Sequence, residues 1–175
     1  MPHPLSRFRF CPACGAADFQ PHDARSKRCT NCGFTFYLNA SASTVAVIRD
    51  AEGRLLVVRR AKEPARGTLD LPGGFVDPGE TLTEGCLREV REELGIEGHI
   101  GPLLFSLPNE YVFSGFTVPT IDAFFEVTTD TPELAAPGDD ADEVLWLYPQ
   151  EICPEDFGLN SIRKGISALL IDYLR

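Results

Sequence analysis

No run of about 18 apolar residues occurs in the 175-residue sequence, and the N-terminal MPHPLSRFRF does not form the apolar core of a signal peptide. We therefore expect neither a membrane span nor secretion, and a cytoplasmic location is the simplest expectation. Internal repeats and low-complexity segments are also absent. The length and a hydrophobic content of 43% allow one ordinary core with a small attached module, rather than two large domains.

Positive charge is in short supply, because 16 Lys and Arg residues stand against 26 Asp and Glu residues, giving a net charge of −10. Nonspecific binding to a nucleic-acid backbone needs a positive surplus, so it is unfavourable for the whole chain. Residues 1–40 nevertheless carry five basic and two acidic residues (+3), whereas the remainder carries 11 and 24 (−13). A small basic module therefore precedes a strongly acidic one. Solubility of each part explains this difference as well as a basic contact surface does.

Histidine is scarce as well. His3, His22 and His99 have no partner at the spacing of metal ligands, so we expect them to be solvated or structural. Of the six cysteines, Cys86 falls within a predicted helix and is expected to be a small core residue, whereas Cys153 has no readable role.

The other four cysteines form two CxxC pairs, Cys11-Pro-Ala-Cys14 and Cys29-Thr-Asn-Cys32. Each pair turns the chain so that two thiolates face one point, and four thiolates complete the tetrahedron that Zn²⁺ prefers. Such a site has no open position for water, so we expect a structural zinc that supplies folding energy to a zinc ribbon over residues 1–39. Two disulfides or four free thiols are the alternatives; the paired spacing and a reducing cytosol favour zinc.

Residues 40–175 are expected to form an α/β domain with a mixed sheet covered on its faces. β-rich sequence flanks the turn Asp50-Ala51-Glu52-Gly53, which predicts two strands paired as a hairpin. Further strands are expected at 69–71, 100–107, 119–127 and 143–148, and helices at 81–94 and 161–175. The stretch 128–142, rich in Pro, Thr and acidic residues, is expected to be a mobile loop.

The first predicted helix is well bounded. Thr81-Leu82-Thr83-Glu84 has the form of a capping box, and Gly95 suits the left-handed position that ends a helix. At about 100° per residue, Glu89, Glu92 and Glu93 share one face. Like charges repel there, and a Mg²⁺ or Mn²⁺ ion would cancel the repulsion, because hard cations bind carboxylate oxygens.

Two glycines precede this helix. Gly73 and Gly74 would let backbone carbonyls approach the same ion closely, and Arg88 is placed to brace a neighbouring carboxylate. The alternative is a solvated helix with ordinary ion pairs such as Glu84–Arg88. The fixed order of glycine loop and acidic helix favours the metal site.

That order carries a family resemblance. The pattern Gly74-x(5)-Glu80-x(7)-Arg88-Glu89-Val90-x-Glu92-Glu93-x-Gly95-Ile96 matches the signature of the Nudix hydrolases at every defined position. The resemblance implies an α/β/α sandwich and metal-dependent hydrolysis of a nucleoside diphosphate linked to another group. It also implies roles for individual residues: Glu89 and Glu93 as principal metal ligands, Glu92 as a ligand or as the base that activates water, Gly73 or Gly74 as a carbonyl ligand, and Glu80 and Arg88 as support.

A zinc ribbon ahead of such a domain resembles the NADH pyrophosphatase branch of this family. Members of that branch carry S-Q-P-W-P-F-P-x-S after the signature, where this chain has SLPNEYVFS over residues 106–114. The serines, the first proline and one aromatic position survive, whereas the Gln, the Trp and two prolines do not. The candidate substrate-binding residues are Phe75, Ser106, Pro108, Tyr111, Phe113 and Ser114. Sheet packing explains Phe113 as well as base stacking does.

An acidic run precedes Trp146, at a place where relatives often carry an additional acid that helps with metal or water. Asp140 as a metal ligand and Glu143 as a catalytic residue are the candidates. Asp139 and Asp142 are expected to be solvated by water.

Together these features favour a diphosphate hydrolase that uses Mg²⁺ or Mn²⁺ and releases a nucleoside monophosphate from a nucleotide such as NADH, NAD⁺, ADP-ribose or FAD. Relatives with this layout are often homodimers. The alternative is a regulatory or nucleic-acid-binding protein, in which the basic ribbon binds a partner and the acidic domain only senses a nucleotide. The intact Glu89, Glu92 and Glu93 argue against that alternative.

Overall fold

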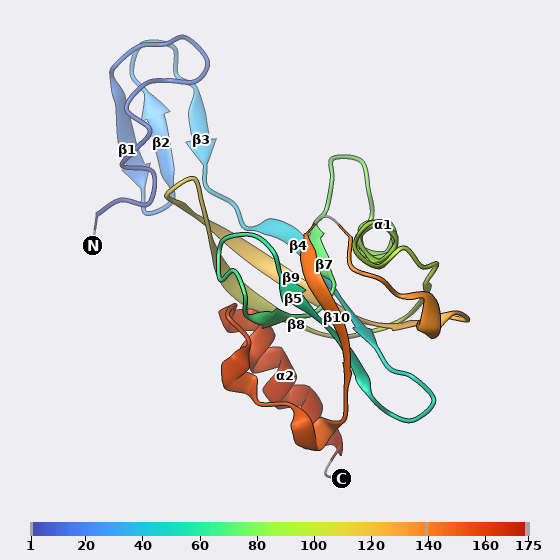
Figure 1. The fold of residues 1–175 in the computed structure, drawn as a ribbon. Coiled ribbons are helices and arrows are strands. Elements are labelled where there is room, and N and C mark those ends of the chain that lie inside the picture. The colour runs from blue at the N-terminus through green and yellow to red at the C-terminus, as the bar shows by residue number, and fades with distance from the viewer. Residues whose placement is uncertain (1, 139, 174–175) are drawn as a thin grey trace. The chain divides into compact units, whose positions relative to one another are not determined.

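The computed structural model of the protein describes residues 2–138 and 140–173, so Asp139, which was expected to be solvated, lies outside the described residues (Figure 1). The chain forms two compact units, Met1–Ala40 and Ser41–Arg175, and each is described by itself. Within the described residues, no helix has the length and apolar character needed to span a membrane.

The N-terminal unit is a three-stranded antiparallel sheet in the order β1-β2-β3, with bounds Phe19–Asp23, Ser26–Cys29 and Thr35–Tyr37. Its small core contains Cys11, Phe19 and Cys29. A core this small supplies little folding energy, so this unit depends on further stabilisation.

The second unit contains two sheets. A four-stranded sheet has the order β7-β4-β9-β8, with bounds Gly73–Phe75, Ser41–Ile48, Phe116–Thr128 and His99–Phe113. It is mixed, because β4 and β9 are parallel whereas the other neighbours are antiparallel. An antiparallel sheet has the order β10-β5-β6, with bounds Ala141–Leu147, Leu55–Arg60 and Leu69–Asp70.

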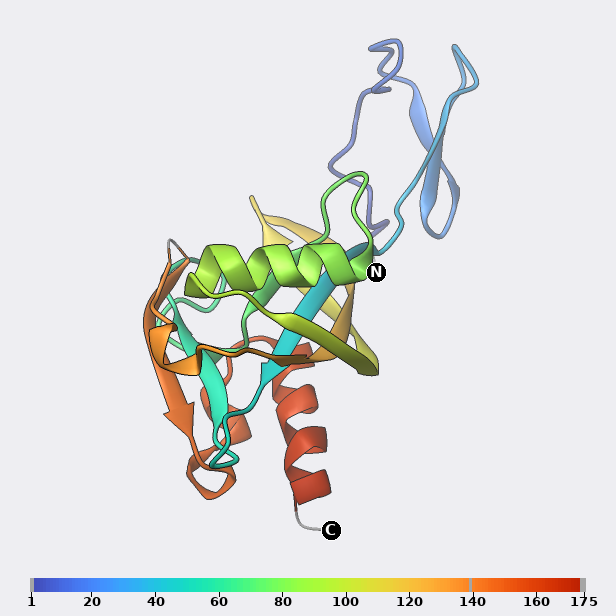
Figure 2. The ribbon, with the colours of Figure 1, turned by 90° about the vertical axis from the view of Figure 1, so that its right-hand side faces the viewer.

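Two α-helices, α1 (Leu82–Leu94) and α2 (Asn160–Tyr173), lie on opposite sides of these sheets (Figures 1 and 2). Three short 3-10 helices complete the unit: Pro132–Leu134, Pro149–Glu151 and Pro154–Asp156. The α/β/α arrangement with a mixed sheet confirms the fold expected from the sequence.

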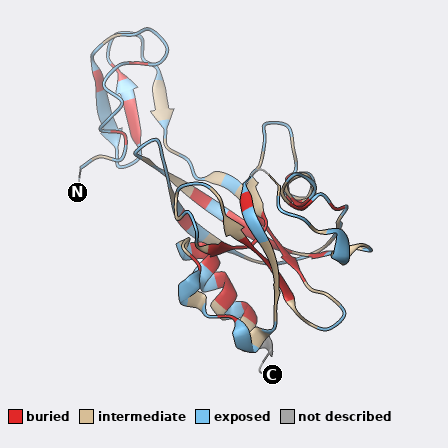
Figure 3. Cartoon of the chain, viewed as in Figure 1, coloured by how far each residue is buried: buried red, intermediate tan, exposed pale blue. Residues whose placement is uncertain are grey.

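Two apolar layers hold the helices to the sheets. Figure 3 marks the buried residues along the strands and helices of this unit. Successive side chains of a strand point to opposite faces. Accordingly, Val45 and Val47 of β4 pack with α2, whereas Ala46 and Ile48 pack with α1. Strand β4 is therefore buried on both faces and forms the centre of the unit.

The expected hairpin around residues 50–53 is wrong beyond its turn. Strands β4 and β5 belong to different sheets, and only an isolated bridge between Arg49 and Leu55 joins them at the turn. A strand has two edges, and both edges of β4 are taken by β7 and β9, while those of β5 are taken by β10 and β6. The two strands therefore diverge.

Strands β8 and β9 are longer than expected and form one hairpin that includes most of residues 106–114. Ser114 and Gly115 both adopt positive φ, at 51° and 69°. Two consecutive residues of this kind make the tight turn whose twist matches the flanking strands. The candidate residues 106–113 therefore lie on a strand that continues past its expected end at residue 107.

The stretch 128–142, expected to be a mobile loop, is fixed at Ala136 and Gly138, which contact the C-terminal end of α1. The backbone N–H of Ala136 donates to the carbonyl of Leu94 at 3.0 Å, and that of Gly138 donates to the carbonyl of Glu93 at 2.8 Å. The last carbonyls of a helix have no partner within the helix, so this contact satisfies them. The polar and acidic composition of this stretch gave no sign of these backbone contacts with α1.

Candidate active site

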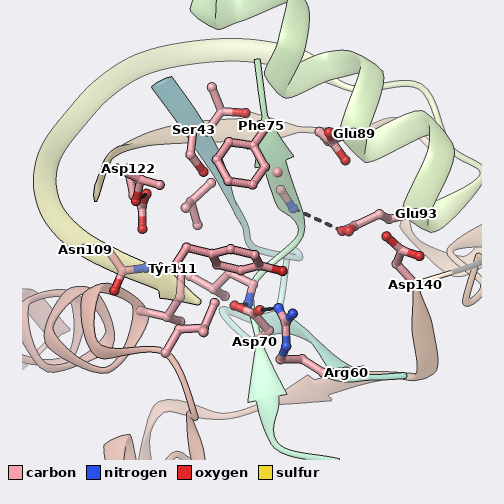
Figure 4. A pocket seen from close by; sticks show the side chains of 18 of the residues that line it. Ser43, Arg60, Asp70, Phe75, Glu89, Glu93, Asn109, Tyr111, Asp122 and Asp140 are labelled. Carbon is pink, nitrogen blue, oxygen red and sulfur yellow. Dashed lines mark hydrogen bonds and ion pairs between the residues drawn. The ribbon is translucent and has the colours of Figure 1, made fainter. Parts of the chain in front are cut away.

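A cavity of about 380 Å³ lies beside the mixed sheet, within the second unit. Helix α1 contributes Glu89 and Glu93 to its wall, β5 contributes Arg60, and β8 contributes Asn109 and Tyr111 (Figure 4). Acidic side chains therefore face aromatic and amide side chains across one space.

Helix α1 is fixed at both ends by local interactions. The Thr81 hydroxyl accepts the N–H of Glu84 at 3.2 Å, and the Glu84 carboxylate accepts the N–H of Thr81 at 2.8 Å. Gly95 ends the helix at φ 68° and donates to the carbonyl of Arg91. The expected capping box and terminus are confirmed, and they set which face of the helix meets the cavity.

The carboxylate of Glu93 is strongly perturbed at this site. It is partly buried, and the backbone N–H of Gly73 donates to its Oε2 at 3.0 Å. Burial, together with the negative charges of Glu89, Asp70 and Asp140, raises the pKa of Glu93 to about 8, against the effect of the Gly73 bond. Such a carboxylate gains more than most from a nearby cation.

Glu89 lies on the same wall. Burial raises its pKa, as do the charges of Glu92 and Asp140, while Arg88 opposes the shift. Gly74 faces this side chain so closely that a Cβ at position 74 would lie 2.7 Å from Glu89 Oε1. A side chain at position 74 would therefore displace the Glu89 carboxylate from its place at the cavity.

Arg88 holds the acidic face together. Its guanidinium donates to Glu80 Oε1 at 2.8 Å, to Glu89 Oε1 at 2.8 Å and to Glu92 Oε2 at 3.0 Å. It also donates to the carbonyl of Phe75 at 2.9 Å. The hydrogen bond from Arg88 lowers the pKa of Glu80. The alternative pair Glu84–Arg88 is replaced by these contacts, since Glu84 is used in the capping box.

The three glutamates of the acidic face do not converge on one point. Glu89 and Glu93 line the cavity, whereas the side chain of Glu92 is 60% exposed and is held on the outside by Arg88. Within the described residues, the three carboxylates do not form a ready metal-binding cluster of the kind that the cysteines form.

The two additional acids are separated by the structure. Asp140 lines the cavity and forms an ion pair with Lys62. Glu143 lies on β10 and forms an ion pair with Arg59 at 3.0 Å, away from the described lining of the cavity. Geometry therefore favours Asp140 over Glu143 as the further acid of this site.

Of the candidate substrate-binding residues, Phe75, Tyr111 and Phe113 line the cavity. The rings of Phe75 and Tyr111 meet edge to face, with centroids 5.4 Å apart and planes at 86°. Ser106 and Pro108 are exposed on the other face of β8, because side chains alternate along a strand.

Ser114 lies in the turn after β8, outside the described lining of the cavity. The described lining of the cavity thus includes the three aromatic candidates and lacks the two serines and the proline, and substrate binding by any of them stays a prediction. Phe113 is exposed at the cavity, so sheet packing does not account for it.

Several polar residues of the cavity were not foreseen. Asp70 forms a buried ion pair with Arg60, and burial raises the pKa of Asp70 despite the neighbouring guanidinium. Asn109, Thr120 and Asp122 are also buried and line the cavity. The signal that could have found them is a polar residue at an inward position of an otherwise apolar strand, as in IDAFFEV over 121–127.

The four cysteines of the N-terminal unit converge, and their sulfur atoms all lie within 4.8 Å of one another. The closest pairs, Cys11 with Cys32 and Cys14 with Cys29, are each 3.7 Å apart, which is far beyond a disulfide bond of about 2.05 Å. Disulfides are therefore not formed, and the group could hold a metal ion as four thiolates.

Comparison with known proteins gives consistent matches. A NUDIX domain matches residues 40–170. An ADP-ribose pyrophosphatase of Methanocaldococcus jannaschii is 30% identical over 147 residues, which cover 81% of this chain and 78% of that protein. A NAD-capped RNA hydrolase NudC of Stutzerimonas stutzeri is 27% identical over 146 residues, covering 82% and 49%. The chain spans about half the length of the curated NudC relatives that match most of it.

A solved structure extends the likeness to the fold. The crystal structure of a NUDIX hydrolase from Nitrosomonas europaea has a TM-score of 0.76 to this chain, at 24% identity, and the match covers 94% of this chain and 91% of that chain.

Proposed function

The chain belongs to the Nudix family, and on that basis we propose that it is a metal-dependent hydrolase of a nucleoside diphosphate linked to a second group. The reaction is attack of water on phosphorus, cleavage of the bridging P–O bond and release of a nucleoside monophosphate. The other product is the phosphate ester of the second group.

The observation that supports this proposal is the pairing of Glu89 and Glu93 at the cavity. Burial and neighbouring negative charges raise the pKa of both carboxyls, so a bound Mg²⁺ or Mn²⁺ ion would offset an unfavourable concentration of negative charge. Gly74 leaves the space that Glu89 needs, and Asp140 lies at the same cavity. We assign Glu89, Glu93 and Asp140, with a carbonyl of Gly73 or Gly74, as the groups that would hold the metal.

Bound metal would polarise the diphosphate and neutralise its charge. The residues of the chain prepare this chemistry. Arg88 orients Glu89 and Glu92, and the N–H of Gly73 orients Glu93. Glu80 in turn anchors Arg88 through two hydrogen bonds, at 2.8 and 3.1 Å. The role of Glu92 as a ligand or as the base stays a prediction, as does a catalytic role for Glu143.

We propose ADP-ribose, NADH, NAD⁺ and FAD as the leading substrates. The names of the matched ADP-ribose pyrophosphatase and NAD-capped RNA hydrolases support this set. The cavity of about 380 Å³ is within the ordinary range for a small-molecule site, and the Phe75 and Tyr111 rings offer apolar surface to a base.

A panel of these four compounds, incubated with Mg²⁺ or Mn²⁺ and followed by product identification, tests the proposal. We expect release of AMP from at least one of them. Absence of turnover for every compound, with protein shown to be folded, would refute it.

For the N-terminal unit we propose a structural zinc bound by Cys11, Cys14, Cys29 and Cys32. The convergence of the four sulfur atoms supports this assignment. Four protein ligands would leave no position for substrate or water.

A further inference from the structure

Part of the cavity is built from a row of polar side chains on one face of the mixed sheet. In the strand register, Ser43 of β4 lies opposite Phe75 of β7 and opposite Asp122 of β9. Asn109 of β8 lies opposite Thr120 of β9. Residues opposite each other, and residues two apart on one strand, point to the same face. We call Ser43, Asn109, Thr120 and Asp122 the polar floor. Figure 4 labels Ser43, Asn109 and Asp122 of this set.

The polar floor occupies positions that would otherwise belong to the core. Two residues further along the same strands, Val45 and Phe124 lie in the apolar layer beneath α2. Thr120, Asp122 and Asn109 are as secluded as core residues, with exposures of 3%, 4% and 8%. Burial of polar groups costs free energy unless they form hydrogen bonds. A polar row here is therefore explained best by a polar ligand.

Asp122 is the charged member of the floor. The hydroxyl of Thr120 donates to its Oδ1 at 2.6 Å, and the hydroxyl of Ser161, in the first turn of α2, donates to its Oδ2. No cationic side chain lies within ion-pair distance of it among the described residues. A carboxylate has about four acceptor positions, so two hydroxyl donors leave it able to accept more.

The charge of Asp122 limits what can bind there. A phosphate would be repelled by this carboxylate, whereas Asp70 of the same cavity is paired with Arg60. The diphosphate therefore belongs at the opposite wall, beside Glu89 and Glu93, where metal would balance its charge. The polar floor is left for an uncharged part of the substrate that carries hydrogen-bond donors.

Asn109 and the aromatic rings of the cavity further restrict the chemical group that can bind at the polar floor. Asn109 and Asp122 are diagonal neighbours across β8 and β9, near enough for one planar ligand to contact both. The amide both donates and accepts, whereas the carboxylate only accepts. Phe75 and Tyr111 offer ring surface beside them. An unpaired nucleobase is bound by polar groups that form hydrogen bonds with its edge and by aromatic rings that contact its face.

We propose that the polar floor selects the base of the substrate, with Asp122 accepting a hydrogen bond from an exocyclic amino group and Asn109 donating to the adjacent ring nitrogen. This inference rests on the proposed hydrolase function and names its substrate class: nucleotides with an amino-bearing base, such as adenine. In hypoxanthine a carbonyl oxygen replaces the amino group, so two acceptors would face each other.

The first test compares AMP with IMP as ligands of the wild-type protein, by calorimetry in the presence of Mg²⁺. We expect AMP to bind roughly 10- to 100-fold more tightly, because an acceptor left facing another acceptor loses about that factor. Equal affinities would overturn the inference. The measurement needs neither turnover nor a variant, so it stands even if hydrolysis fails.

The second test compares kcat/KM for NADH and for its hypoxanthine analogue in the wild type and in Asp122→Asn. The amide of the variant can donate to the carbonyl of hypoxanthine, so we expect the preference for adenine to shrink at least tenfold. An equal loss for both substrates would instead mark Asp122 as structural or as a ribose contact, and would contradict the inference.

Asp142→Asn is the matched control, because it makes the same chemical change at an exposed position of β10. Its preference for adenine should equal that of the wild type. Turnover of both NADH and its analogue without any preference would refute the base-selecting floor while leaving the hydrolase proposal intact. The two failures are therefore distinguishable.

Discussion

Glu93 is the residue at which a bound metal ion would have the clearest effect. Burial and nearby negative charges raise its pKa to about 8, and the backbone N–H of Gly73 opposes that shift. We predict that Glu93→Gln loses at least ~10²-fold in kcat/KM, because a charged ligand is lost at the metal site with little change of shape. In metal-free buffer its melting temperature should equal or exceed that of the wild type. A large fall in melting temperature would instead mark Glu93 as structural.

The raised pKa of Glu93 also sets a pH dependence. The unfolded chain releases this proton near pH 4.5, whereas the metal-free folded protein keeps it until about pH 8. Since the unfolded state binds fewer protons in this window, the contribution of Glu93 to stability falls as pH rises from about 4.5 to about 8. Added Mg²⁺ should therefore stabilise the protein more at pH 8.5 than at pH 5.5.

Thermal unfolding at several pH values, with Mg²⁺ and with a chelator, measures this effect. Glu93→Gln should remove most of the pH dependence of the metal effect. A Mg²⁺ stabilisation that is the same at both pH values in the wild type would contradict the assignment.

Gly73 and Gly74 are predicted to fail in different ways when changed to alanine. At position 74 the new Cβ would meet the flexible Glu89 carboxylate, so activity should fall while the fold survives. At position 73, where φ is 151°, it would lie 2.0 Å from the backbone oxygen of Thr44, so the fold itself should be destabilised. Melting temperature and kcat/KM for both variants separate the two effects. Equal stability losses would contradict this division.

At the scale of elements, the sequence predicted α1 most accurately because its signals are local. The capping box and Gly95 lie within the helix and its ends, so the bounds Leu82–Leu94 agree with the expected 81–94. Strand partners depend on distant residues instead. The turn at residues 50–53 was visible, but nothing local indicates that β7 and β9 take the edges of β4.

Site residues could likewise be predicted from the sequence only where their arrangement is local. The acidic face of α1 follows from helical spacing, whereas the exposure of Glu92 and the polar floor depend on tertiary packing. Asp122 and Asn109 are neighbours because β8 pairs with β9. Ser106 and Pro108 lie outside the described lining of the cavity because β8 extends past the expected end at residue 107, and its side chains alternate between two faces.

The N-terminal unit should depend on its metal, because its apolar core is small. We predict one tightly bound zinc per chain, released by a strong chelator together with loss of hydrogen-exchange protection in β1 and β2. Cys29→Ser, which removes one of the four thiolates, should reproduce this loss without a chelator. A metal assay that finds no zinc in folded protein would refute the four-thiolate site.

For the whole molecule, family membership fixes the fold, and the cavity determines the chemistry. An acidic protein with a net charge of −10 binds an anionic nucleotide only if the negative charge around its site is balanced. The cavity itself contributes the carboxylates of Glu89, Glu93, Asp122 and Asp140. The metal dependence that we propose is therefore consistent with the charges of the cavity. The homodimer and the cytoplasmic location expected from the sequence stay predictions, which sedimentation and cell fractionation would test.

The central claim is that Glu93 and its neighbours catalyse metal-dependent attack of water on a diphosphate. The most direct measurement follows AMP release from ADP-ribose in ¹⁸O-labelled water, with Mg²⁺ or with a chelator, for the wild type and Glu93→Gln. We predict AMP release only by the wild type with Mg²⁺, and label from water in one of the two phosphate products. Release of AMP without metal, or equally by Glu93→Gln, would contradict the claim.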